Sequence, residues 1–62
     1  MVSTAKVSQF LEGLVFPASK EQIINYVRDN NAPQDVLNVL EKMPDGKYYS
    51  TAAVLDSLSR AA

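Results

Sequence analysis

The sequence predicts an all-α protein, a compact bundle of four short helices. Three observations support this prediction. Apolar residues recur at helical spacing in four segments. Gly, Pro or Asn residues separate these segments. Residues that favour helix N-caps stand near the start of several of them. A chain of 62 residues is the size of one small domain. We therefore expect a single domain over residues 1–62, with an ordered core over about residues 4–59.

The first predicted helix follows Ser3 or Thr4, either of which can cap its N-terminus. One apolar stripe follows at the i, i+3, i+4 and i+7 positions, formed by Val7, Phe10, Leu11 and Leu14. Gly13 marks the C-terminus, because glycine readily adopts the left-handed conformation that ends many helices. The segment 15–17 combines β-branched, aromatic and helix-stopping residues and is predicted to be a short extended link.

The second predicted helix has the clearest start signal of the chain. Ser19 is the expected N-cap, and Gln22, three residues later, completes a capping box. The apolar face consists of Ile23, Ile24, Tyr26 and Val27. Asn30 and Asn31 are expected to end the helix, because asparagine tolerates the left-handed backbone of a C-terminal cap.

The third predicted helix begins with Pro33 at its first helical position, where the missing N–H costs no hydrogen bond. Asp35 in the first turn suits the positive end of the helix dipole. The inward face consists of Val36, Leu37, Val39, Leu40 and Met43. The run 44–46, Pro-Asp-Gly, is a strong turn signal and ends this segment.

A second extended link is predicted over residues 47–49, and Ser50 then caps the fourth helix. Its inward face consists of Val54, Leu55 and Leu58. Asp56 and Arg60 have the i, i+4 spacing of an ion pair on a helix surface.

A weak internal repeat relates residues 11–24 to residues 40–55. Each half contains a helix end, a link with an aromatic residue, a serine cap and a pair of aliphatic residues. The repeat predicts a pseudo-two-fold arrangement in which the links near 15–17 and 47–49 lie side by side as a minimal two-stranded ladder. In that arrangement Phe16 and Tyr48 would fill the core. The alternative is that any pair of amphipathic helices produces a similar pattern.

The composition argues against catalysis. The chain has no Cys and no His, so the commonest general base, the strongest nucleophile and the usual zinc ligands are missing. Two glycines cannot form a glycine-rich phosphate loop. Glu12 and Glu41 occupy matching places in the two halves and could form a paired acid site, but two solvated helix-face acids are the favoured interpretation. We expect a protein that is not an enzyme and that has no cofactor and no metal.

The charge pattern bears on partners and location. The net charge is −1, and the six Lys and Arg residues are dispersed among seven acids, which does not favour binding to nucleic acid or to a membrane surface. Residues 1–6 lack the apolar core of a signal peptide, and no apolar run approaches the length of a membrane span. We therefore expect a cytoplasmic protein.

A helix-turn-helix reader of nucleic acid is the alternative. The short turn between the second and third helices suits that motif, and Gln34, Asn38 and Lys42 would then read the nucleic acid. A basic face formed by Lys20, Arg28 and Lys42 would favour this alternative, because phosphate contacts supply most non-specific affinity.

Exposed aromatic residues are the best functional clue. Side chains alternate between two faces in an extended segment, so either Tyr48 or Tyr49 is expected in the core and the other in solvent, and Val15 and Phe16 should alternate likewise. An outward Tyr49 near Val15 and Tyr26 would form a possible interaction surface, although a single exposed tyrosine needs no explanation. We expect a small protein–protein interaction module or regulator, with an unknown protein partner or self-association, since a dimer would stabilise so small a core.

Three runs of the sequence carry a resemblance to a known family. Residues 11–21 (LEGLVFPASKE), residues 32–46 and residues 47–54 (KYYSTAAV) resemble the start, middle and end of the bacterial domain-of-unknown-function 2795 family. The resemblance implies that Tyr48 is the core aromatic and implies no activity. Family members often carry Pro and Glu where Thr51 and Ala53 stand here, so a weaker final capping box is expected.

Overall fold

The computed structural model of the protein describes residues 4–61 and confirms the predicted all-α bundle. Four helices and two two-residue strands follow one another along the chain. They are α1 (Thr4–Leu11), β1 (Ala18–Ser19), α2 (Lys20–Asp29), α3 (Gln34–Glu41), β2 (Lys47–Tyr48) and α4 (Thr51–Ala61). Within the described part of the chain, every helix is too short or too polar to cross a membrane.

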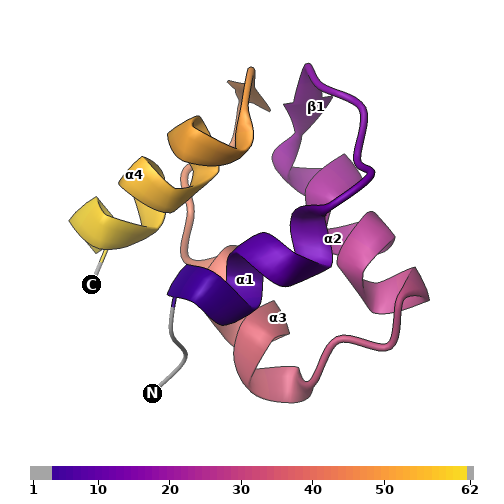
Figure 1. Cartoon of the computed structure of the whole chain (residues 1–62). Coiled ribbons are helices and arrows are strands. Elements are labelled where there is room, and N and C mark those ends of the chain that lie inside the picture. Colours follow the sequence, from indigo (N-terminus) through magenta and orange to yellow (C-terminus); the bar gives the residue numbers. More distant parts are fainter. Residues whose placement is uncertain (1–3, 62) are drawn as a thin grey trace.

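The two halves of the chain repeat the order helix, strand, helix, as the internal repeat predicts. The strands lie side by side at one end of the molecule, and α1 crosses its middle (Figure 1). The helix α2 packs against α3, and α4 packs against α1, so each half uses its second helix against the first helix of the other half. This matched packing and the antiparallel strand pair support the pseudo-two-fold arrangement.

The predicted ladder is present, but its first strand lies later in the sequence than predicted. The structure pairs Ala18 with Tyr48 and Ser19 with Lys47, instead of using residues 15–17. Pro17 has no backbone N–H to donate to a ladder, so regular pairing can begin only after it. The Phe16–Pro17 peptide bond is cis. The pairing continues into α2, where the backbone N–H of Lys20 donates to the carbonyl of Gly46 at 3.1 Å.

The two serine caps are confirmed, and they differ as the flanking residues predict. The backbone N–H of Gln22 donates to Ser19 Oγ at 3.1 Å, and the N–H of Ser19 donates to Gln22 Oε1 at 2.8 Å. This is a complete capping box at α2. At α4 the N–H of Ala53 donates to Ser50 Oγ at 3.1 Å, but alanine has no side chain with which to return the bond.

Helix ends also follow the sequence closely, with three corrections. Leu14 and Met43, predicted on the inward faces of the first and third helices, lie just beyond the ends of α1 and α3, although both pack against or within the core. Gly13, just after α1, and Asn31, just after α2, adopt positive φ angles of 84° and 63°. Both therefore take the left-handed conformation predicted for these helix ends. The prediction for Pro33 was one residue wrong. Its extended ψ of 160° makes it the N-cap of α3, and Gln34 is the first helical residue. Thr4 already belongs to α1, and the other proposed cap of α1, Ser3, lies outside the described residues.

The core is entirely apolar among the described residues. Its buried members come from all four helices, β1 and the segment after α3: Val7, Leu11, Ala18, Ile23, Ile24, Val27, Val36, Leu40, Met43, Val54 and Leu58. The radius of gyration is 10.0 Å, against about 10.6 Å for a typical folded domain of this length. The chain therefore packs its core within a single copy, and its stability depends on helix packing and caps.

The difference between the caps gives a stability prediction. Ser19→Ala should lower the free energy of unfolding by about 1 kcal/mol, since it removes one bond of a complete capping box. Ser50→Ala should cost less, because it removes a cap with no reciprocal partner. Chemical denaturation monitored by circular dichroism measures both, with the exposed Ser59→Ala on α4 as the control. Equal losses for Ser50→Ala and Ser19→Ala would contradict the prediction.

Candidate interaction surface

The ladder has an inner and an outer face, as the alternation of side chains in a strand requires. On the inner face Ala18 is buried and Tyr48 is half-buried against the core. In the link before β1, Phe16 packs against the core and Val15 is 80% exposed, as the predicted alternation of these two residues requires. Tyr49 is 71% exposed, so the prediction that one of the two tyrosines faces solvent is confirmed.

The register of the strands gathers the outward residues of both links. Ala18 pairs with Tyr48, so the next position brings exposed Pro17 opposite Tyr49. Lys47 lies two residues before Tyr49 and is also exposed. Residues two apart in a strand point to the same side. Val15 is exposed two residues before Pro17 but lies outside the paired strands, and we include it when we call the exposed set Val15, Pro17, Lys47 and Tyr49 the ladder face.

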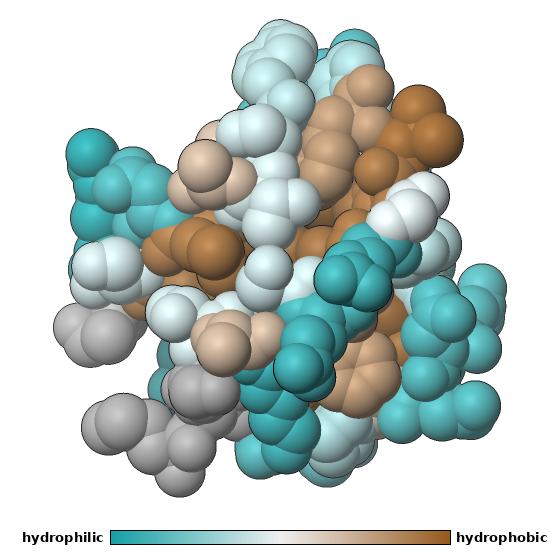
Figure 2. All heavy atoms as spheres, viewed as in Figure 1, coloured by the Kyte–Doolittle hydropathy of each residue, from teal (hydrophilic) through white to brown (hydrophobic). Residues whose placement is uncertain are grey.

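The ladder face contains the large hydrophobic residues that the structure exposes most. Among residues 4–61, Val15 and Tyr49 are the exposed large hydrophobics. Figure 2 shows hydrophobic side chains reaching the surface over the loop between α1 and β1. The two links thus each expose one large hydrophobic residue, and exposed hydrophobic and aromatic residues are typical of the centres of interaction sites.

Tyr26, the third residue of the predicted surface, has a different environment. It is half-buried against the core, and its hydroxyl donates to the backbone carbonyl of Glu12 at 2.6 Å. The same oxygen would lie 2.9 Å from a Cβ atom placed on Gly13. Tyr26 therefore holds the turn after α1, and its polar atom is already engaged within the chain.

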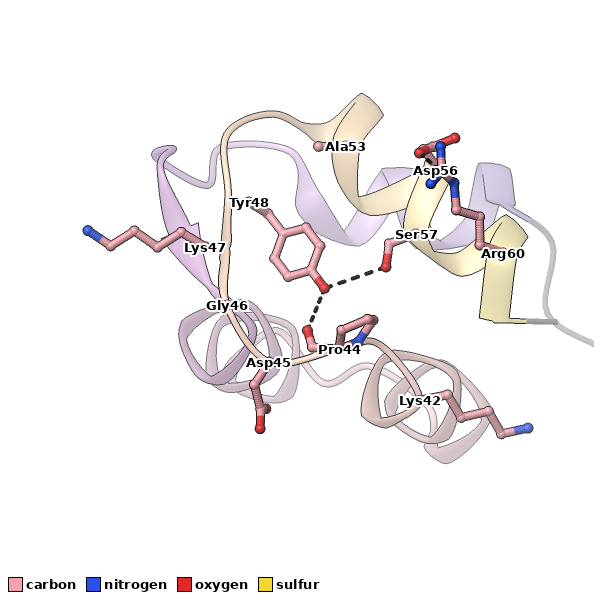
Figure 3. Close-up of a pocket in the computed structure, with 10 residues that line it drawn as sticks. All are labelled: Lys42, Pro44, Asp45, Gly46, Lys47, Tyr48, Ala53, Asp56, Ser57 and Arg60. Atoms are coloured by element: carbon pink, nitrogen blue, oxygen red, sulfur yellow. Dashed lines mark hydrogen bonds and ion pairs between the residues drawn. The ribbon is translucent and has the colours of Figure 1, made fainter.

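A cleft of about 570 Å³ opens beside the ladder, between the segment 42–48 and α4. Its lining includes the turn residues Pro44–Gly46 and the ring of Tyr48 (Figure 3). The Tyr48 hydroxyl donates to the carbonyl of Pro44 at 2.5 Å and lies 3.5 Å from Ser57 Oγ. Both hydroxyls therefore tie the turn to α4 and serve the fold.

The charged residues around the cleft fall into two groups. Asp56 and Arg60 pair on α4 at 3.2 Å, as their i, i+4 spacing predicts. Lys42 and Lys47 instead extend their ammonium groups away from the cleft into solvent (Figure 3). The structure describes no ion pair or hydrogen bond for either ammonium group within residues 4–61. Lys47 on β2 and Lys42 at the end of α3 therefore leave two positive charges on opposite sides of the cleft without a described partner.

The structure does not assemble the basic face that would favour nucleic-acid binding. Lys20 and Arg28 line a second concavity of about 190 Å³, which three carboxylates share: Glu21, Glu41 and Asp45. The side chain of Lys20 is only 17% exposed. Its ammonium group donates to the backbone carbonyl of Glu41 at 2.7 Å and lies 3.7 Å from Asp45 Oδ1. Lys42 lies on the other cleft. Lys20 therefore joins α2 to the end of α3 and is not available to a phosphate backbone.

The other candidate pairs are Gln34 with Asn38, the predicted nucleic-acid readers, and Glu12 with Glu41, the predicted acid pair. The side-chain amide of Gln34 donates to Asn38 Oδ1 at 2.9 Å, so these two residues of α3 bond to each other. Glu12 lies in the turn held by Tyr26, whereas Glu41 lies beside Lys20 in the second concavity. Each glutamate contributes its backbone carbonyl to a structural hydrogen bond, and both side chains face solvent.

Comparison with known protein families gives one match. The family described as protein of unknown function, DUF2795, matches residues 2–55. The chain belongs to this family. The DUF2795 match includes both strands and both links, so the ladder face lies wholly within the matched segment. No curated protein and no solved structure matches the chain.

Membership of DUF2795 agrees with two details of the structure. The family resemblance implied that Tyr48 is the core aromatic, and the half-buried Tyr48 confirms this. It also implied a weaker final capping box. At α4, Ser50 Oγ accepts a bond from the Ala53 N–H, and Ala53 has no side chain to return it, so the cap is weaker. The family description carries no activity.

Sequence reasoning missed two members of the ladder face, Pro17 and Lys47. Lys47 could have been found, because its two-residue spacing from Tyr49 places both on one side of an extended link. Pro17 could not, since its position opposite Tyr49 depends on a register that only the folded chain defines.

The different environments of two tyrosines give a second prediction. Tyr26→Phe should lower the free energy of unfolding by about 1 kcal/mol, because it removes the bond to the Glu12 carbonyl. Tyr49→Phe should change it by less than about 0.5 kcal/mol, since surface substitutions away from structural contacts have small effects. Thermal and urea denaturation of both variants provide the measurement. If Tyr26→Phe is as stable as the unmodified chain, its assigned structural role is wrong.

Proposed function

We propose that this protein is a non-enzymatic interaction module, a small regulator or adaptor that binds a protein partner through its ladder face. The observation that carries the proposal is the exposure of Val15 and Tyr49 on neighbouring links of one two-stranded ladder. The backbone beside these two residues is anchored, because Phe16 and Tyr48, their immediate neighbours in sequence, pack against the core.

A rigid attachment of this kind favours binding. Tyrosine combines a large apolar ring with a polar hydroxyl and is common at the centres of interfaces. The backbone that presents Tyr49 is already ordered by its neighbour Tyr48, whose ring and hydroxyl contact the core and the turn at Pro44. A partner would therefore bind a surface whose backbone needs little further ordering, which reduces the entropic cost of association.

The chemistry of the side chains supports a non-enzymatic role. The chain offers no imidazole and no thiol, and the cleft hydroxyls of Tyr48 and Ser57 are occupied by structural contacts. The proposal also places the protein in the cytoplasm, where a chain without cysteine suits a reducing environment. Self-association is the related form of the hypothesis, in which the partner is a second copy.

The test is binding by matched surface variants. Partners are captured from native lysate with the unmodified chain, and their affinity is then measured for Tyr49→Ala and Val15→Ser. Each substitution should weaken binding by at least about tenfold, because truncation of a central interface residue commonly costs more than 1 kcal/mol. Melting temperatures should stay unchanged, since both side chains are exposed.

Gln9→Ala is the control, because Gln9 is exposed on α1 and outside the ladder face. It should bind every captured partner as the unmodified chain does. The proposed function fails if Tyr49→Ala retains full affinity for all of them. It also fails if the purified chain turns over a substrate and loses that activity on substitution of a single carboxylate.

A further inference from the structure

We infer that the ladder face receives an acidic protein segment, in which an apolar side chain packs against Tyr49 and a neighbouring carboxylate pairs with Lys47. This inference rests on the proposed function and adds the chemistry of the partner. It is carried by the distribution of compensated and uncompensated charges over the described residues.

Most cations of the chain already have partners. Lys6 pairs with Asp35 at 3.5 Å, Lys20 donates to the Glu41 carbonyl, and Arg60 pairs with Asp56. Arg28 donates to Asn25 Oδ1 at 3.0 Å. Lys42 and Lys47 remain, and within residues 4–61 no ion pair or hydrogen bond of their ammonium groups is described. Both line the same cleft, on the segment that carries β2.

The two acids that line this cleft have cationic partners. Asp45 lies 3.7 Å from the Lys20 ammonium, and Asp56 is paired with Arg60. The lining of the cleft beside the ladder face therefore has a slightly positive rim, because three cations (Lys42, Lys47 and Arg60) face two carboxylates (Asp45 and Asp56), although the whole chain carries a net charge of −1. A positive rim attracts an acidic partner and sets the orientation in which it approaches.

The spacing on β2 suits one short segment. Lys47 and Tyr49 are two residues apart on the outward side, which corresponds to about 7 Å along a strand. An extended partner segment with the same two-residue spacing can place an apolar side chain against Tyr49 and Pro17 and a carboxylate at Lys47. A partner segment shifted along the strand would place its carboxylate against Tyr49 and its apolar side chain against Lys47. The charge beside the apolar residue therefore disfavours that register.

A protein segment fits this surface better than a nucleic acid does. Two uncompensated lysines neutralise few phosphates, and phosphate neutralisation supplies most nucleic-acid affinity. Lys20 and Arg28 cannot add to this charge, because they share the second concavity with three carboxylates: Glu21, Glu41 and Asp45.

The experiment selects peptides by their sequence. A library of random 12-residue peptides is selected on the full chain and depleted on Tyr49→Ala, so that only peptides dependent on the ladder face remain. We expect Asp or Glu within two residues of an aromatic or aliphatic residue in the retained peptides. Selection on Lys47→Glu should replace the acidic residues with Lys or Arg.

Affinity measurements then quantify the charge contribution. Lys47→Glu should weaken the selected acidic peptide by at least about fivefold, as expected for loss of a surface ion pair and its replacement by repulsion. Arg28→Glu, a charge reversal on α2 in the second concavity, should leave the affinity within about twofold. Raising the salt concentration should weaken the binding of the acidic peptide. It should not weaken the binding of a control peptide in which Asn and Gln replace Asp and Glu.

Several outcomes would overturn the inference. Retained peptides that are neutral or basic, or an unchanged preference on Lys47→Glu, remove the acidic segment as the occupant while leaving the proposed function standing. Failure to retain any peptide dependent on Tyr49 also overturns it, and the proposed function is then decided separately by the capture experiment. A dimer in sedimentation equilibrium that Tyr49→Ala converts to monomer identifies a second copy as the occupant. Oligonucleotide binding that requires both Lys47 and Tyr49 identifies a nucleic acid.

Discussion

The pairing of Ala18–Ser19 with Lys47–Tyr48 is the contact on which the rest of the structure depends. Ser19 is at once the end of this pairing and the N-cap of α2, so the strand pair and the helix start cannot move independently. Lys20, the next residue, bonds through its backbone to Gly46 and through its ammonium to the carbonyl of Glu41. These contacts at adjacent residues join the two halves of the chain and set the direction of α2 relative to α3.

The same pairing separates the residues that stabilise the protein from those available to a partner. Ala18 and Tyr48 turn inward, where they complete an apolar core that has neither a disulfide nor a metal to support it. Pro17 and Tyr49 consequently turn outward at the adjacent positions, because successive side chains of a strand alternate. The exposure of Pro17 and Tyr49 is thus a direct consequence of the contact that holds the halves together.

Local signals in the sequence were reliable where one residue type has few conformational choices. The capping box of Ser19 and Gln22, the left-handed Asn31 and the turn at Pro44–Gly46 all act within a few residues, and each is found as predicted. The errors came from positions where two local signals compete. Pro33 suits both an N-cap and a first helical turn, and Pro17 suits an extended link while excluding itself from a regular ladder.

The sequence by itself determined the four helices, the serine caps of α2 and α4 and the exposure of Val15 and Tyr49, because propensity, capping and periodicity are properties of neighbouring residues. Only the tertiary structure decided that Pro17 stands opposite Tyr49, that the Tyr26 hydroxyl holds the turn at Glu12, and that Lys20 is engaged while Lys47 is not. Each of these three facts depends on a strand register or on contacts between residues that are far apart in the chain. No short run of sequence encodes a register or a long-range contact.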